Sequence, residues 1–189
     1  SPKLSDVLNK TQSAASTAVV ATRNAVGRSS SYAVMDSGWK LQYDVYNDKN
    51  RYIPLNADVA GLCAQTSNGF DDWWSPAGHT RGNVKNVTSL VFNPDKQSRD
   101  ALYKTGINNV VTFREDGTVL YGDKTLQGKT SAFQYIGIRR LFIVLQKAIK
   151  KAAKYSLFEF NDEYSQAAFR NMVNPYMRSV KGRRGLADF

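Results

Sequence analysis

Few residues in this sequence could perform covalent chemistry, because the chain has one histidine, His79, and one cysteine, Cys63. A nucleophile activated by a histidine would have to use His79, which follows Pro-Ala-Gly in a polar loop. Cys63 lies in an apolar helical pattern, which is typical of a buried structural thiol in a reducing compartment. One histidine and one cysteine are also too few ligands for a zinc site. We therefore predict no catalytic residue, no metal site and no cofactor.

Two short motifs resemble catalytic or nucleotide-binding elements but have the wrong context or spacing. Asp71 and Asp72 are neighbouring carboxylates in a loop rich in Gly, Pro and Asn, where turn formation is the simpler explanation. The Gly-Lys-Thr at residues 128–130 imitates the end of a phosphate-binding loop, which also requires a glycine five residues before Gly128. That position is occupied by Asp123. We predict neither an enzyme nor a small-molecule substrate.

The strongest charge pattern lies on one face of a long amphipathic helix predicted at about residues 136–156. Apolar residues recur at spacings of three and four from Ile138 to Ala152, which gives the helix one buried face. The opposite face carries no acidic residue, and an apolar residue in its middle suggests that this face is covered. Its members are Arg139, Arg140, Ile143, Lys147, Lys150, Lys151 and Lys154. We predict a docking surface here, with a merely solvated helix face as the alternative.

The charge of the whole chain also indicates an acidic partner. The formal net charge is +10, and residues 137–189 carry 11 Lys and Arg against four Asp and Glu. Nucleic acid, a membrane surface or an acidic protein would each fit such a charge. The sequence has no apolar run long enough to span a bilayer and no secretory signal at its start. Nor does it contain a known nucleic-acid-binding motif, so a basic nucleic-acid-binding domain is the alternative function.

Other patterns predict how the chain folds. A β-hairpin is expected at about residues 109–122, because Gly117 can adopt the positive φ that a tight turn demands. A last helix should begin near Asp162 and kink or restart at Pro175. Alternating apolar and polar residues predict a half-buried strand whose apolar positions are Trp39, Leu41, Tyr43 and Val45. The fold class is therefore α+β, a mixed β-sheet with flanking helices. Residues 1–30 are expected to form an N-terminal helix of the same domain, and residues 31–189 its core.

Four segments carry a resemblance to a known family. They are YDVYNDKNRYIPLNADVAGLCAQTSNGFDDWWSPAGHTRG at 43–82, TVLYGDKTL at 118–126, IRRLFIVLQKAI at 138–149 and KYSLFEFND at 154–162. In the same order, these segments resemble the tail sheath proteins of contractile-tailed bacteriophages. The similarity extends over about residues 32–185. Several motifs in one order are more specific than any single motif.

The resemblance implies a structural role. Sheath subunits of this kind are assembled in the host cytoplasm and form stacked hexameric rings around the tail tube of the virion. They contract to drive the tube through the host envelope. The fragment would be the family's inner domain, truncated before the C-terminal arm strand that extends the sheet of a neighbouring subunit. Its expected partners are other sheath subunits and the tail tube protein, with no membrane and no nucleic acid. The basic face of the long helix would then be turned toward acidic groups on the tube or on adjacent subunits.

Overall fold

The computed structural model describes residues 23–24 and 26–189. Most of the N-terminal helix expected within residues 1–30 lies outside the described part. A helix end is observed at Gly27, which has a φ of 59° and whose amide donates to the carbonyl of Asn24 at 3.1 Å. A glycine in this conformation is the usual residue just after the end of a helix.

The strands form two small antiparallel sheets. Strands β1 (Trp39–Asp44) and β2 (Lys49–Pro54) pair as a hairpin, and β3 (Ser89–Leu90) adds to the other edge of β1. Strands β4 (Asn109–Phe113) and β5 (Gly117–Tyr121) form the second sheet, which confirms the predicted hairpin. The α+β class is confirmed, but these pairings replace the single mixed sheet that we expected. Both hairpins have short turns, and short turns can join only antiparallel strands.

Two helices and the hairpin β4–β5 enclose most of the core. Helix α2 (Asn56–Gly69) packs Val59 and Leu62 against Val110 and Leu120 of the hairpin. Helix α3 (Lys96–Lys104) buries Leu102 in a second cluster with Phe92 and Ile107. Asp95 caps α3, because its side chain accepts from the amide of Ser98 at 2.9 Å. These contacts make one body from residues between about 30 and 126.

Strand β1 buries the opposite face from the one predicted. Lys40 is only 3% exposed, whereas Trp39 is 50% exposed and Tyr43 is also exposed. The ammonium of Lys40 lies 2.9 Å from Oδ1 of Asp58 on α2 and also donates to the carbonyl of Lys85. A lysine can bury its aliphatic stem when its charged end has such partners. The aromatic face of β1 is therefore left uncovered.

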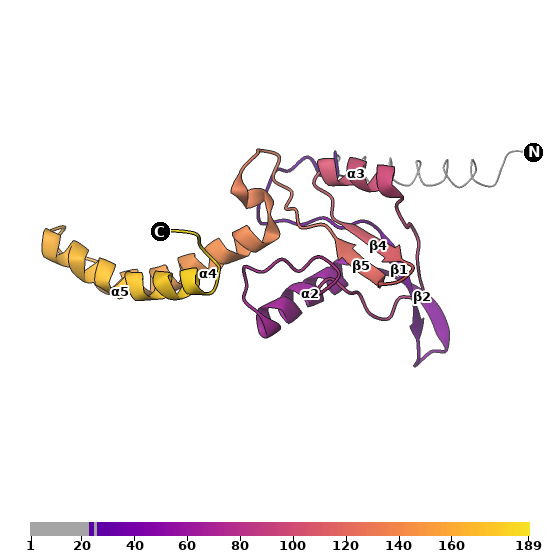
Figure 1. Ribbon diagram of the computed structural model, residues 1–189, viewed down its shortest axis with the longest axis horizontal. Coiled ribbons are helices and arrows are strands. Elements are labelled where there is room, and N and C mark those ends of the chain that lie inside the picture. The colour runs from indigo at the N-terminus through magenta and orange to yellow at the C-terminus, as the bar shows by residue number, and fades with distance from the viewer. Residues whose placement is uncertain (1–22, 25) are drawn as a thin grey trace, which may run out of the picture.

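Two long helices form an arm that projects from this body, as Figure 1 shows. The predicted helix is confirmed as α4 (Ile136–Ala153), which is preceded by the short helix η1 (Ala132–Gln134) and followed by η2 (Lys154–Ser156). Helix α5 (Glu163–Gly182) returns along α4 and continues as one helix through Pro175. At the base of the arm, Leu141 and Leu145 of α4 are buried against Val180, Tyr176 and Met177 of α5, together with Trp73 of the body. Each large apolar side chain buried there contributes about 1.5 to 3 kcal/mol to stability.

Candidate interaction surface

The base of α4 is held tightly against the loop at residues 71–75. A Cβ placed on Gly137 would lie 2.6 Å from the carbonyl oxygen of Trp73, so the helix backbone touches the loop backbone. The carbonyl of Asp123 accepts from the amide of Ile136 at 3.3 Å. Burial raises the pKa of the Asp123 carboxyl, while hydrogen bonds from Ser75 and from the amides of Ile136 and Gly137 oppose the rise. A glycine at 137 is therefore required for this close approach.

Arg140 is used inside the molecule and is not part of a free basic face. Its side chain is 18% exposed, and Nη2 lies 3.0 Å from Oδ1 of Asp72. The same nitrogen donates to the carbonyl of Cys63 at 3.0 Å and to Oγ of Ser67. Arg140 thus joins α4 to α2 and to the loop. The helix face itself carries no acidic residue, as predicted from the sequence, but Asp72 lies close to Arg140 in space although it is distant in sequence.

Arg139 is also engaged within the chain. Its guanidinium lies 4.3 Å from the ring centroid of Tyr32 and 4.0 Å from that of Phe133, and it donates to Oη of Tyr32 at 3.2 Å. Cation–π contacts of this kind orient a charge without neutralising it. Ile143, the apolar residue in the predicted face, is half-buried. The first turn of α4 therefore fastens the arm to the body.

The distal half of α4 carries the free charge. Lys147, Lys150, Lys151 and Lys154 are all exposed, and none of them forms an ion pair within residues 26–189. Together with Ala153 and Leu157 they line a hollow of about 480 Å³. Of the seven predicted surface residues, the structure thus groups four lysines and separates Arg139, Arg140 and Ile143 from them.

We had predicted that Asp71 and Asp72 only form a turn. In the structure both also form ion pairs with the arm. Asp71 pairs with Arg183 at the end of α5, while Asp72 pairs with Arg140 on α4. Between them and the arm, the indole of Trp73 donates to the carbonyl of Arg183 at 3.1 Å and lies against Gly185. We call residues 71–75 the clamp loop. The sequence did not predict this role. The only signal for it is an acidic pair, Asp71 and Asp72, directly followed by two tryptophans.

His79 and Cys63, the residues considered for catalysis, have different surroundings. Nδ1 of His79 lies 3.0 Å from Oδ2 of Asp116 on the β4–β5 turn, and its ring lies near Phe113 and Tyr121. Burial raises the pKa of the half-buried Cys63 thiol, which makes the thiolate less accessible. Within the part of the chain that the structure describes, no group of three His, Cys, Asp or Glu side chains could hold a metal ion. Among the described helices, none is long and apolar enough to cross a membrane.

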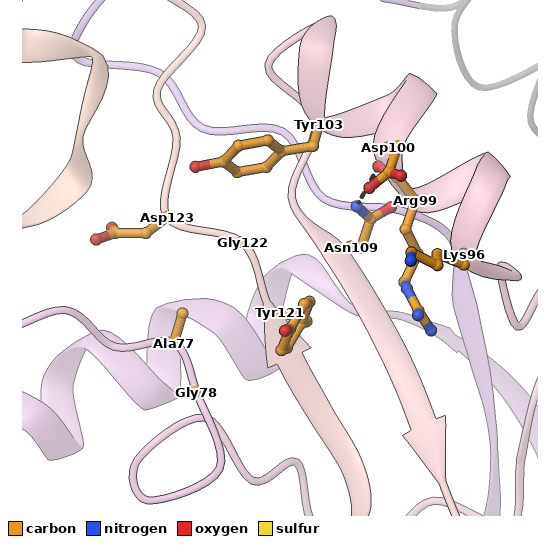
Figure 2. Close-up of a pocket in the computed structure, with 10 residues that line it drawn as sticks. All are labelled: Ala77, Gly78, Lys96, Arg99, Asp100, Tyr103, Asn109, Tyr121, Gly122 and Asp123. Atoms are coloured by element: carbon orange, nitrogen blue, oxygen red, sulfur yellow. Dashed lines mark hydrogen bonds between the residues drawn. The ribbon is translucent and has the colours of Figure 1, made fainter.

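A second hollow, of about 460 Å³, lies between α3 and the end of β5 (Figure 2). Tyr103 and Tyr121 lie on opposite sides of it, and Asp123 points away from α3. At its edge Asn109 donates to the carbonyl of Arg99 at 3.1 Å. The Arg99 guanidinium is 5.6 Å from the centroid of Phe113, so it contributes to packing. The lining of this hollow also includes the charged side chains of Lys96, Asp100 and Asp123.

Comparison with known proteins defines the class. The family model "Phage tail sheath protein central domain" matches residues 7–126. The tail sheath protein of Vibrio phage KVP40 is 49% identical over 161 residues, which cover 85% of this chain and 24% of that protein. The tail sheath protein of Enterobacteria phage T4 is 44% identical over 168 residues, which cover 89% of this chain and 26% of that protein.

Solved structures share the same fold. The sheath of an extracellular contractile injection system, PVC, in the contracted state matches with a TM-score of 0.73 and 27% identity, over 86% of this chain and 44% of that chain. The contracted helical sheath of the anti-feeding prophage matches with a TM-score of 0.71 and 22% identity, over 82% of this chain and 41% of that chain. The fold of this chain is therefore shared with about two fifths of the chain in contractile sheath structures.

The chain belongs to the phage tail sheath protein family, as its four motifs had suggested. Proteins of this family are structural components of the virion tail, and the relatives give no support to the nucleic-acid-binding alternative. The chain spans about a quarter of the length of the curated relatives that it matches.

Proposed function

We propose that this chain is the inner part of a tail sheath subunit that polymerises into stacked hexameric rings around a tail tube. The rings contract to drive the tube through the host envelope and deliver the genome. The observation that carries this proposal is the identity of 40% to 49% with tail sheath proteins over most of the chain. The subunit is assembled in the host cytoplasm and acts in the virion by docking, without catalysis or a cofactor.

The outer edge of β2 supports strand exchange between subunits. In the three-stranded sheet β2 lies at one end, and in the described part of the chain its second edge pairs with no strand. Its residues are almost all exposed. An unpaired edge is a template for a strand from another chain. We infer that the C-terminal strand of a neighbouring subunit, which is distinct from the helical arm, adds at such an edge.

Contraction requires the same subunits to pack in two ways. Contacts between unlike surfaces of identical subunits generate helical arrays, and strands exchanged through flexible connections can act as hinges between nearly rigid bodies. The compact cores around α2 and α3 support the assignment of this chain as such a rigid body.

The distal lysines of α4 are the candidate contact with acidic groups on the tube or on adjacent subunits. Exposed ion pairs are individually weak and are screened by salt. Such a contact suits an attachment that must be released during contraction. Arg139 and Arg140 contribute to it indirectly, because they set the position of the arm.

Electron microscopy of the natural gene product tests the proposal. We expect hollow tubes with a sheath lattice, formed without nucleic acid.

Simultaneous substitution of Lys147, Lys150 and Lys151 by Glu should reduce assembly on tail tubes, whereas the same change at the exposed Lys85, Lys104 and Lys129 should not. Unchanged assembly of the first variant would remove the attachment role. Particles that form only on DNA, with binding that falls steeply with salt, would restore the nucleic-acid alternative.

A further inference from the structure

Helix α4 is capped by an acid from another part of the chain. Its own N-terminal segment supplies no side chain that bonds to the first amides, and its first turn contains no acidic residue. Instead, the carboxyl group of Asp123, just after β5, accepts hydrogen bonds from the amides of Ile136 and Gly137. The side chain of Ser75, in the clamp loop, bonds to the same carboxyl group. Because free amides at a helix N-terminus need an acceptor, Asp123 ties the base of the arm to the body.

One oxygen of this carboxyl group has no partner. Oδ1 of Asp123 is buried and has no hydrogen-bond donor among the described residues. A buried oxygen without a donor costs much more free energy in an ionised carboxylate than in the neutral acid. In agreement, burial raises the pKa of the Asp123 carboxyl, although its hydrogen bonds and the charge of Arg140 oppose the rise. The observed position of the arm therefore favours the protonated form of Asp123 more than water does.

The groups that face Asp123 come from several elements. The guanidinium of Arg140, on α4, stays charged near neutral pH, and Asp72 faces this site through its ion pair with Arg140. Burial raises the pKa of the Cys63 thiol on α2 and of the Tyr103 hydroxyl on α3, so both stay neutral in this range. The other charged groups nearby are Lys124, over the ring of Tyr103, and Lys96, Arg99 and Asp100, from which Asp123 points away in Figure 2.

We propose that Asp123 is a proton-linked latch, which holds the arm against the body more firmly when its carboxyl group is protonated. The neutral acid still accepts from the α4 amides through its carbonyl oxygen. If the base of α4 lifts away from the body, the carboxyl group becomes hydrated and ionises at its ordinary pKa. A state that binds a proton more tightly is stabilised as the pH falls. Acid therefore tightens the junction, and opening of the arm near neutral pH releases a proton.

Native-state hydrogen exchange of the purified chain between about pH 5 and pH 8, corrected for intrinsic exchange rates, measures how often α4 opens. Protection of the amides at residues 136–143 should fall as the pH rises. The fall should be up to about tenfold for each pH unit between the pKa values of the open and closed states. Amides of α3, measured in the same samples, report on the body and should not follow this profile.

Three variants identify the group that binds the proton. Asp123→Asn keeps the shape and one carbonyl acceptor but cannot ionise, so the start of α4 should stay well protected at every pH. Asp123→Ala removes the acceptor and should give weak protection at every pH. The matched control is Asp36→Asn, which removes another buried acid of raised pKa from the segment before β1. That control should keep the α4 profile of the parent.

Two results would overturn the latch: protection of α4 in the parent that does not change with pH, or an unchanged profile in Asp123→Asn. A profile that disappears in Asp36→Asn would assign the proton to Asp36 and reject Asp123. If Asp123→Ala fails to fold, as thermal unfolding would show, the comparison of the parent with Asp123→Asn still decides. The latch acts within one chain, so it goes beyond the proposed function and does not depend on it. Electron microscopy of assembled tubes tests that function separately.

Discussion

Arg140 on α4 and Asp72 in the clamp loop lie 3.0 Å apart, at the point where the arm meets the body. The same loop holds the end of α5 through the ion pair of Asp71 with Arg183. One short segment thus fixes both helices of the arm. Because the arm carries the distal lysines, the clamp loop decides where these lysines lie relative to the sheets.

The first prediction concerns this ion pair. Asp72→Asn keeps the shape of the side chain and removes its charge, so it should lower the free energy of unfolding by about 1 to 2 kcal/mol, below the range for fully buried pairs. Urea denaturation gives the stability, and faster hydrogen exchange in α4 should accompany the loss. Asp188→Asn, which removes the exposed pair with Lys181, is the control and should leave the free energy of unfolding nearly unchanged. Equal losses in the two variants would mean that Asp72 does not fasten the arm.

The second prediction concerns the close contact at Gly137. Gly137→Ala places a methyl group 2.6 Å from the carbonyl oxygen of Trp73, and the helix must shift to accept it. We expect a loss of about 1 to 3 kcal/mol, the usual cost of overpacking. Gly61→Ala in α2 is the matched control, because nothing lies within 4 Å of its added Cβ. That control should gain about 0.5 to 1 kcal/mol from helix propensity. Thermal unfolding that shifts both variants in the same direction would contradict this explanation.

The third prediction is a pH dependence at Asp36. Burial raises the pKa of its carboxyl to about 6, against the opposing effect of a hydrogen bond from Asn108. A raised acid pKa means that the folded protein holds the proton more tightly than the unfolded chain does. The free energy of unfolding therefore falls as the pH rises from the unfolded pKa of Asp36 through 6. Asp36→Asn should therefore be more stable than the parent by on the order of 1 to 3 kcal/mol at pH 7.5. The difference should shrink below pH 6 and vanish near pH 4. An advantage that is constant across this range would rule out ionisation as its cause.

The fourth prediction concerns the buried pair of Lys40 and Asp58. Asp58→Ala leaves the ammonium of Lys40 without its carboxylate and should cost about 3 kcal/mol or more. Lys40→Met removes the buried charge and should cost much less. The double variant should recover much of the Asp58→Ala loss, because no unpaired charge remains in the core. Chemical denaturation of the three variants completes a double-mutant cycle. Additive losses would show that the two side chains do not interact.

Strand β1 shows that the alternation of apolar and polar residues does not predict which face of a strand is buried. Alternation correctly indicated a strand beginning at Trp39, which the structure ends at Asp44. It could not tell which face of the strand is covered, because the two faces differ only in their neighbours. Here Asp58 on α2 supplies a partner for Lys40, and the aromatic residues face outward. Which face of β1 is buried therefore depends on α2, a helix that begins after the β1–β2 hairpin.

The sequence by itself determined the family, the α+β class, the hairpin β4–β5 and the long helix α4, because motif order and local periodicity need no knowledge of distant contacts. It also showed how little reactive chemistry the chain contains. Only the tertiary structure decided which charges are free. It joined Arg140 to Asp72 and Arg183 to Asp71 across more than sixty residues, and it left the distal lysines exposed. An ion pair depends on which segments meet in space, and that is a property of the folded chain that no local pattern contains.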